Sequence, residues 1–344
     1  MGIWLISYTA RGRALAARVA DILKDSGHDC RTFALPKFCE GEDEALTASA
    51  SDWAGAGFAE ADALIFCCAS GIAVRAIAPH VVSKTSDPAV VVMDELGTYA
   101  IPVLSGHLGG ANALAVQLSR ACGALAVVTT ATDIHGLFAV DDWARRQGLR
   151  VANPERIKWI SARLLSGETI RYKSLYPISG PVPAHLESAD EEYDILISHR
   201  IRGRDTALRL VPPIVTLGVG CRKNISRQAV EAAIDNALRR AGCHPAAVSA
   251  VATIDLKAHE GALVRYCKDK GIPLVTYSAE ALSQVPGVFS SSAFVQKTTG
   301  VDNVCERAAV CHSGGRLIRP KEAMDGVTVA LALSEPHLSF QEAL

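Results

Sequence analysis

The sequence predicts an α/β protein in which two doubly wound, mainly parallel-sheet domains are joined by a small middle domain. Apolar runs of strand length alternate with amphipathic helical stretches in the first and last parts of the chain, which is typical of parallel sheets covered by helices on both faces. A length of 344 residues suits two or three compact units. Because the pattern loosens between the two regular parts, we expect domains over residues 1–135, 136–211 and 212–334, followed by a tail over 335–344.

In the first domain, five apolar runs are expected to form strands, over residues 3–8, 63–68, 89–93, 101–104 and 125–129. Helical patterns follow the first, second and fourth runs. Gly27 and Pro79 would end the first two helices, because glycine favours a helix C-terminus and proline cannot continue a helix. The third helix is expected to reach about Cys122.

The middle domain has one helical stretch near residues 157–165, a segment rich in proline and glycine over 176–183, and an acidic run over 187–194. We expect a small linking domain there, and its residues indicate no function. The last domain opens with an apolar run over 214–220, and Ser226 then caps a helix that Gly242 ends. Its remaining elements are expected to be strands over 248–254, 273–277 and 327–333 and helices over 262–270, 279–284 and 304–312.

Composition argues against several classes of protein. Lys and Arg total 35 and Asp and Glu total 36, so no net field would draw the chain to nucleic acid or to an anionic membrane. No apolar stretch approaches 18 uninterrupted residues, and the opening residues are expected to form a buried strand and not a signal peptide, so we expect a cytoplasmic protein without a membrane span. The ten cysteines are scattered without a Cys-x-x-Cys pair, which favours reduced thiols over disulfides or zinc.

The densest polar cluster lies between residues 70 and 112, mostly just after the expected strands. In open α/β sheets the ligand binds at the carboxyl ends of the strands, because helix N-termini direct free N–H groups into the crevice there. A ligand with carboxylates would suit such an edge. The cluster comprises Ser70, Gly71, Arg75, His80, Lys84, Asp87, Asp94, Glu95 and the segment from Ser105 to Asn112.

Within this cluster, the segment over 105–112 is the most suggestive of function. Gly106, Gly109 and Gly110 would let backbone approach a ligand closely, and His107 titrates near neutral pH. A tight turn containing a hydrogen-bonded histidine explains the segment equally well. Glu95 ends a buried strand, where a carboxylate is costly unless it is solvated, paired or used, so a loop acid is its alternative. The cations of the cluster could neutralise ligand carboxylates or form weak surface ion pairs.

The last domain carries a second candidate anion site. Gly220, Arg222 and Lys223 lie between the first strand and the capped helix, where glycines and cations suit a negative group. The third glycine of a dinucleotide-binding Gly-x-Gly-x-x-Gly loop is missing, so a nicotinamide or flavin dehydrogenase is not expected. Lys257, Glu260 and Thr299 could line the same edge, or they could serve only as helix caps.

Taken together, these segments resemble the CbiG family, the cobalt-precorrin-5A hydrolases. The resemblance covers nearly the whole chain and includes a CobE-like carboxy-terminal domain. It rests in the first domain on residues 71–75, 84–88, 94–95 and 105–112, and in the last domain on residues 218–222, 257–260, 299–301 with Glu306, and 328–330. His259, Asn303 and Arg307 are small departures from the family pattern.

The resemblance implies a reaction in the anaerobic route to cobalamin. Water opens the δ-lactone of a ring-contracted cobalt tetrapyrrole, and acetaldehyde leaves to give cobalt-precorrin-5B. Cobalt would arrive within the substrate, so no resident cofactor or metal site is expected. The tetrapyrrole is the expected ligand, and pathway methyltransferases are expected as transient partners.

Lactone opening needs a base for water and donors for the developing oxyanion. We expect Glu95 or His107 to be the base, and the helix N-terminus at Gly109 and Gly110, with Lys84, to supply the donors. The other expected substrate contacts are Arg75, His80, Asp87, Ser105, Gly106, Asn112, Gly220, Arg222, Lys223, Lys257, Glu260 and Thr299. A non-enzymatic tetrapyrrole carrier that passes intermediates to methyltransferases is the alternative from another class. A flavodoxin-like or nucleotide-binding oxidoreductase is the third possibility.

Overall fold

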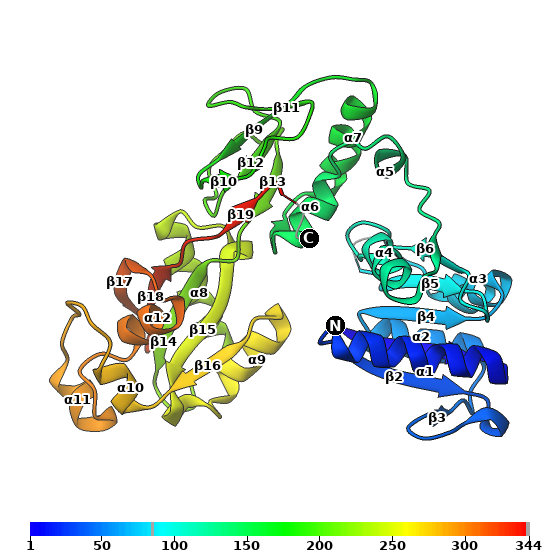
Figure 1. Ribbon diagram of the computed structural model, residues 1–344. Helices are drawn as coiled ribbons and strands as arrows, with labels where there is room; N and C mark the ends of the chain where they lie inside the picture. Colours follow the sequence, from blue (N-terminus) through cyan, green and yellow to red (C-terminus); the bar gives the residue numbers. More distant parts are fainter. Residues whose placement is uncertain (84–85, 342–344) are drawn as a thin grey trace. The chain divides into compact units, whose positions relative to one another are not determined.

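A computed structural model describes residues 1–83 and 86–341 of the chain (Figure 1). It contains two compact units, one comprising Met1–Arg145 with Leu164–Ser166 and the other comprising Arg146–Arg163 and the chain from Gly167 onward. Within the described residues, the longest apolar helices fall short of what is needed to cross a bilayer.

The first unit is built on a seven-stranded sheet in the order β3-β2-β1-β4-β5-β6-β7. Strands β1, β2, β3, β4 and β5 run parallel, whereas β6 is antiparallel to β5 and parallel to β7. The strands span Gly2–Ser7 (β1), Asp29–Ala34 (β2), Glu44–Ala45 (β3), Ala63–Cys67 (β4), Ala89–Met93 (β5), Tyr99–Leu104 (β6) and Leu125–Ala126 (β7).

Helices cover both faces of this sheet. Helices α1 (Ala10–Asp25) and α4 (Ala111–Cys122) share a core with Ile3 and Leu5, while α2 (Ala50–Glu60) and α3 (Ser70–Ile77) pack on the side of Trp4 and Ile6. Successive side chains of a strand point to opposite faces, so a strand buried on both faces is apolar at every position. Each such side chain contributes about 1.5–3 kcal/mol when fully buried. The predicted doubly wound α/β arrangement is confirmed for this unit.

Several elements of the first unit were not predicted, among them β2, β3, α2, α5 (Ala131–Ile134) and α6 (Val140–Arg146). Strand β2 alternates exposed and buried residues in its first half, so it lacks the continuous apolar run by which its neighbours were found. Helix α2 contains Gly55 and Gly57, which weaken a helical pattern. The short helices α5 and α6 follow β7.

The second unit begins with a five-stranded sheet in the order β11-β9-β12-β13-β8, in which only β8 is antiparallel to its neighbour. Its strands span Arg150–Val151 (β8), Ile170–Ser174 (β9), Leu186–Ser188 (β11), Ile195–Ile197 (β12) and Leu208–Val211 (β13), and helix α7 spans Ile157–Leu165. Strand β10 (Ile178–Ser179) pairs with β19 (Leu338–Ser339), and the Phe340 ring packs edge-on against Tyr172. Residues 338–340 are therefore attached to the middle region.

The remainder of the second unit forms another five-stranded sheet in the order β16-β15-β14-β18-β17. Strands β14, β15 and β16 are parallel, and β18 is antiparallel to both β14 and β17. The strands span Val215–Cys221 (β14), Val248–Ile254 (β15), Leu274–Tyr277 (β16), Arg316–Met324 (β17) and Val327–Leu333 (β18). The helices are α8 (Arg227–Ala241), α9 (Gly261–Lys270), α10 (Ala279–Ser283), α11 (Ala293–Thr299) and α12 (Cys305–Ser313).

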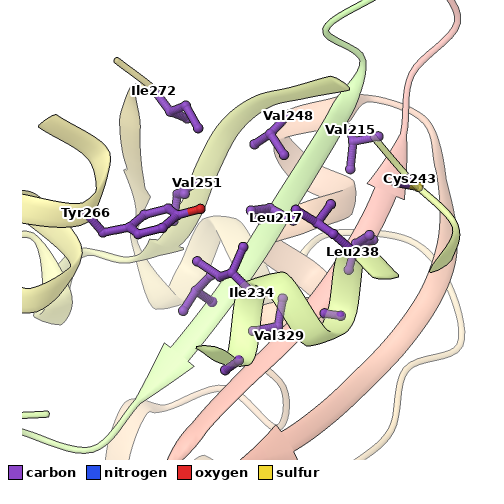
Figure 2. Close-up of a cluster of buried hydrophobic side chains, with 14 of the residues drawn as sticks. Val215, Leu217, Ile234, Leu238, Cys243, Val248, Val251, Tyr266, Ile272 and Val329 are labelled. Atoms are coloured by element: carbon purple, nitrogen blue, oxygen red, sulfur yellow. The ribbon is translucent and has the colours of Figure 1, made fainter. Parts of the chain in front are cut away.

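Helices again cover both faces of this sheet. Side chains of α8 and α9 pack on one face with Val215, Leu217 and Val251 (Figure 2), while α12 packs on the other face with Ala252 and Ile254. Gly218 allows α12 to approach β14, because a Cβ atom at this position would lie 1.7 Å from the carbonyl oxygen of Cys305. The Ser226 cap and the left-handed C-terminal Gly242 of α8 are confirmed. Single 3-10 turns span Pro36–Phe38, Ala78–His80, Pro154–Arg156, Pro245–Ala247 and Asp255–Lys257.

Candidate functional site

The carboxyl edge of strands β1, β4 and β5 is the strongest candidate site in the first unit. From β1 the chain crosses by α1 to β2 on one side, and β4 lies on the other side of β1. Connections that leave a sheet in opposite directions open a crevice between the two strands, where α/β proteins bind ligands. The N-termini of α1 and α3 follow β1 and β4 at this crevice.

Helix α1 is fixed close to the crevice by two residues. Thr9 caps the helix, since its hydroxyl accepts a hydrogen bond of 3.0 Å from the Gly12 N–H. A Cβ atom on Gly12 would lie 2.7 Å from the carbonyl oxygen of Cys67, so only glycine lets this first turn pack against the end of β4. Thr9 was not predicted as a site residue, although its position shortly after a buried strand is a signal for a helix cap at a ligand-binding edge.

Glu95 lies at the same edge, in the turn that joins β5 to β6. The turn is closed by a 2.8 Å hydrogen bond from the Gly97 N–H to the Asp94 carbonyl, and Gly97 has a φ of 72°. The Thr9 hydroxyl donates a 2.7 Å hydrogen bond to Glu95 Oε2. Glu95 is half-buried, so its carboxylate is held beside the start of α1 while remaining open to a ligand.

Asp94 has a different function from its neighbour Glu95. Its Oδ1 accepts a 2.7 Å hydrogen bond from the Tyr99 N–H. Burial alone would raise the pKa of Asp94, but hydrogen bonds from Tyr99 and Thr98 outweigh it and lower the pKa. Asp94 therefore stabilises the turn that presents Glu95.

Exposed apolar side chains flank this carboxylate. Leu96 is 68% exposed next to Glu95, and Ile72 is 38% exposed in the first turn of α3. Helix α3 has no side-chain cap, so its first N–H groups are free of a side-chain partner. Arg75, one turn further along α3, is exposed, and its Nη1 donates to the Gly71 carbonyl at 3.3 Å. The edge thus combines a carboxylate, apolar surface, a helix N-terminus and a cation.

The structure does not bring His107 to this edge. Strand β6 is antiparallel to β5, so the segment after Leu104 lies at the opposite edge of the sheet, where Ser105 Oγ donates to the Asp87 carbonyl at 3.0 Å. The expectation that both acid–base candidates follow strands at one edge is therefore wrong. Strand β5 has five residues, so Glu95 and His107 are separated by roughly 15 Å at about 3.3 Å per residue.

His107 is held between two carboxylates instead. Its Nε2 lies 2.9 Å from Asp133 Oδ2 and its Nδ1 lies 3.2 Å from Asp141 Oδ1. Burial lowers the pKa of His107, but the hydrogen bonds and charges of Asp141 and Asp133 outweigh it and raise the pKa to about 9. The ring is therefore an imidazolium at neutral pH with both nitrogens engaged, an arrangement that does not suit a general base.

The other residues of this segment also serve its own conformation. The Asn112 amide donates to Thr130 Oγ1 and to Asp133 Oδ2, each at 2.9 Å. A Cβ atom on Gly109 would lie 2.4 Å from the Ser105 Cβ, and one on Gly106 would lie 2.8 Å from Asn112 Oδ1, so both glycines are required for packing within the loop. Gly110 has a φ of 89° at the start of α4, where the guanidinium of Arg145 lies close by. We call the segment from Ser105 to Asn112, with Asp133 and Asp141, the histidine clasp.

Two further predicted contacts, His80 and Asp87, lie elsewhere in the first unit. His80 packs on α2, where its Nε2 lies 2.8 Å from the Ser51 carbonyl oxygen, and a Cβ atom on Gly55 would touch its ring. Asp87 is buried, and its carboxylate accepts hydrogen bonds of 3.0 to 3.1 Å from the N–H groups of Val82 and Ser83. These contacts give His80 and Asp87 structural functions. Lys84 lies outside the described residues.

The carboxyl edge of β14 and β15 holds the predicted residues Gly220, Arg222, Lys223, Lys257 and Glu260. The Thr328 hydroxyl donates to the Gly220 carbonyl at 3.1 Å, and the Arg222 N–H donates to the Gly326 carbonyl at 3.0 Å. The side chains of Arg222 and Lys223 are exposed, and no carboxylate of the described chain pairs with either. This edge therefore presents two free cations.

Lys257 and Glu260, which follow β15, form an ion pair. Lys257 Nζ lies 3.1 Å from Glu260 Oε2, and both side chains are largely buried. Cys221 lies near this pair, and burial raises the pKa of its thiol, with Lys257 opposing and Glu260 adding to the effect. Thr299 forms its hydrogen bonds within its own segment, because its hydroxyl lies 2.8 Å from the Val295 carbonyl oxygen and 3.1 Å from that of Val301 at the end of α11.

The buried carboxylate of Glu306 acts as a structural anchor. It accepts hydrogen bonds from the N–H and hydroxyl of Ser290, at 2.9 and 2.8 Å, and from the Lys321 N–H at 2.8 Å. Among the residues that the structure describes, no group of three or more His, Cys, Asp or Glu side chains is arranged to hold a metal ion.

Comparisons with known proteins agree on one family. The profile described as Cobalamin synthesis G N-terminal matches residues 52–133, and the profile described as Cobalamin synthesis G C-terminus matches residues 215–332. The cobalt-precorrin-5A hydrolase of Salmonella typhimurium is 33% identical, over 96% of this chain and 97% of its own. That of Priestia megaterium is 31% identical over 78% of each chain. A cobalamin biosynthesis protein G homolog from Sulfolobus solfataricus, of known structure, is 20% identical over 97% of each chain, with a TM-score of 0.43.

Proposed function

Because the chain belongs to the CbiG family, we propose that it is a hydrolase of cobalamin biosynthesis that acts on cobalt-precorrin-5A. The reaction opens the δ-lactone of the ring-contracted cobalt tetrapyrrole and releases acetaldehyde, giving cobalt-precorrin-5B. The observation that carries the proposal beyond the family is the half-buried Glu95 carboxylate, hydrogen-bonded to Thr9 at the crevice between β1 and β4.

Glu95 is the base in this proposal. It removes a proton from water as the water oxygen attacks the lactone carbonyl, which is necessary because hydroxide is scarce at neutral pH. The carbonyl–oxygen bond of the lactone then breaks, leaving a carboxylate and a free hydroxyl on the two-carbon arm. The N–H groups at the uncapped start of α3 are the donors that we assign to the developing oxyanion.

Release of acetaldehyde requires a second deprotonation. The hydroxyl of the two-carbon arm loses its proton, its oxygen forms the aldehyde carbonyl, and the electron pair of the broken carbon–carbon bond passes to the macrocycle. Since His107 lies at the opposite edge and both its nitrogens are engaged, we assign this step also to Glu95, after the proton that it took from water has been released to solvent.

The surroundings of Glu95 suit a flat substrate that carries carboxylates. Ile72 and Leu96 offer exposed apolar surface for the face of a macrocycle, and Arg75 is available for a carboxylate at its rim. In the second unit, the exposed Arg222 and Lys223 form a separate candidate site for carboxylate groups. Cobalt enters as part of the substrate, and the protein needs no resident cofactor in this mechanism. Pathway methyltransferases are the transient partners that we propose for substrate transfer.

The test is to supply the cobalt lactone and to trap acetaldehyde. Glu95→Gln keeps the shape of the side chain and removes its basicity, so turnover should fall by a factor of about 10²–10⁴. Glu155→Gln, which changes an exposed glutamate of the second unit, is the matched control and should leave turnover unchanged. Full activity of Glu95→Gln would contradict the assigned base while leaving family membership intact.

The same assay separates an enzyme from a carrier. A carrier would bind the lactone tightly without producing acetaldehyde, whereas the proposed hydrolase would release one acetaldehyde for each lactone opened. Binding by the wild-type protein with no aldehyde at any enzyme concentration would favour the carrier. An absorption spectrum of the purified protein tests the third possibility, because a flavin or dinucleotide would be visible.

A further inference from the structure

A cavity of about 360 Å³ in the second unit shares no lining residue with the two candidate carboxyl edges. Its walls come from the end of α8, the residues that lead into β15 and β16, the end of α9, and Arg150 of β8. It therefore lies at the amino ends of β15 and β16. The cations Arg222 and Lys223 and the Lys257–Glu260 pair follow the carboxyl ends of β14 and β15, at the opposite edge of the same sheet.

The floor of the cavity is apolar. Leu238, Val248, Tyr266 and Ile272 line it, and all four are buried members of the core between the sheet and helices α8 and α9. Figure 2 shows the Tyr266 side chain reaching from α9 toward the middle of this cluster, with Ile272 and Val248 on the same side of the sheet. Burial raises the pKa of Tyr266, and nearby Asp235 adds to the effect, so the phenol remains a neutral hydrogen-bond donor.

One wall carries a guanidinium without an acidic partner. Arg150 Nη1 donates to the carbonyls of Ala246 and Val248 at 3.1 and 3.0 Å, which holds the side chain against the cavity. No carboxylate in the described part of the chain forms an ion pair with Arg150, and burial lowers its pKa. The positive charge of this half-buried guanidinium is not balanced by a carboxylate, because its hydrogen bonds go only to carbonyl oxygens. A bound carboxylate would balance the charge and accept hydrogen bonds from the remaining guanidinium N–H groups.

The rim limits the charge of a ligand. Lys270 lies at the rim, where it pairs with Glu231 at 2.9 Å, and the exposed carboxylate of Asp235 lines the same cavity. Asp235 would repel a second negative group. The volume lies near the lower end of the roughly 300–1,000 Å³ that is usual for ligand pockets, which is too small for a tetrapyrrole.

We propose that this cavity binds a small monocarboxylate with an apolar body, the carboxylate on Arg150 and the body against Leu238, Val248 and Ile272. The site is independent of the hydrolase proposal, since it shares no residue with either carboxyl edge. It lies where β8 of the middle sheet meets the last α/β sheet, because Arg150 is bonded to the segment that begins β15. Binding there would tie these two sheets of the second unit together.

The test uses the full-length chain and 3-phenylpropionate as the probe, with calorimetry or ligand-detected NMR as the measurement. The wild-type protein should bind the probe at concentrations below about 10 mM, and it should bind the uncharged analogue 3-phenylpropan-1-ol at least about tenfold more weakly. Arg150→Met should weaken binding of the probe by about tenfold or more. Arg265→Met, which removes an exposed arginine from α9, is the matched control and should leave binding unchanged.

Asp235→Asn provides a second arm that does not depend on a buried residue. Loss of the rim carboxylate should tighten binding of 3-phenylpropionate, and should do so whether or not Arg150→Met folds. The proposal is overturned if the wild-type protein does not bind the probe, if the alcohol binds equally well, or if folded Arg150→Met binds like the wild type. If Arg150→Met does not fold, unchanged binding by Asp235→Asn overturns it.

Discussion

The histidine clasp should make the stability of the first unit depend on pH in alkaline solution. His107 is charged in the folded protein up to a pKa of about 9, whereas an unfolded histidine has a pKa of about 6.5. A group whose pKa is raised by folding contributes its full stability below the unfolded pKa. This contribution is lost as the pH rises through the folded pKa, because the proton must then leave an ion that two carboxylates stabilise.

The size of the effect follows from the contacts. A shift from 6.5 to about 9 corresponds to roughly 3 kcal/mol in free energy at about 1.4 kcal/mol per unit. The Asp133 side chain is 34% exposed, so solvent screens part of the interaction, while the Asp141 side chain is 9% exposed and is screened less. We therefore expect a loss of about 1–3 kcal/mol between about pH 6.5 and pH 10.

Urea unfolding of the wild type and of His107→Gln, followed by tryptophan fluorescence, to which the buried Trp143 of α6 contributes, measures this effect. Other groups titrate in the same range, so the quantity to compare is the difference in unfolding free energy between the two proteins at each pH. That difference should shrink by about 1–3 kcal/mol as the pH rises, because the glutamine does not titrate. A difference that stays constant from about pH 6.5 to 10 would refute the assignment of His107 as an imidazolium.

Two other predictions concern close backbone contacts. Gly12→Ala would place a Cβ atom 2.7 Å from the Cys67 carbonyl oxygen, so α1 must move away from β4. We expect the free energy of unfolding, measured in urea, to fall by about 1–3 kcal/mol. We also expect acetaldehyde production in the lactone assay to fall. Wild-type turnover in Gly12→Ala would argue against the crevice as the active site. Gly218→Ala would place a Cβ atom 1.7 Å from the Cys305 carbonyl oxygen and should destabilise the second unit by about 3 kcal/mol or more, as measured by thermal unfolding. Gly261→Ala is the control, because the nearest atom to its Cβ, at 3.2 Å, belongs to the flexible Arg265 side chain. Equal losses of stability in Gly218→Ala and Gly261→Ala would contradict the packing argument.

The direction of strand β6 separates the two expected catalytic residues, Glu95 and His107. Residues 101–104 were predicted as a strand from their apolar character, and β6 does form there, but apolar character is the same for either strand direction. The antiparallel pairing of β6 with β5 carries His107 to the edge opposite Glu95. The two residues therefore do not form the acid–base pair that their places after successive strands had indicated.

Sequence alone was sufficient for features that depend on local pattern. The doubly wound sheets were predicted from continuously apolar strands, and the ends of α8 were predicted from Ser226 and Gly242. Both predictions succeed because strand burial and helix capping depend on residues that are consecutive in the sequence. Only the tertiary structure decided the surroundings of His107, whose partners Asp133 and Asp141 lie 26 and 34 residues further along the chain. The same is true of the hydrogen bond from Thr9 to Glu95, which spans 86 residues. Contacts of this kind depend on strand direction and packing between elements, and these properties leave no periodic signal in the sequence.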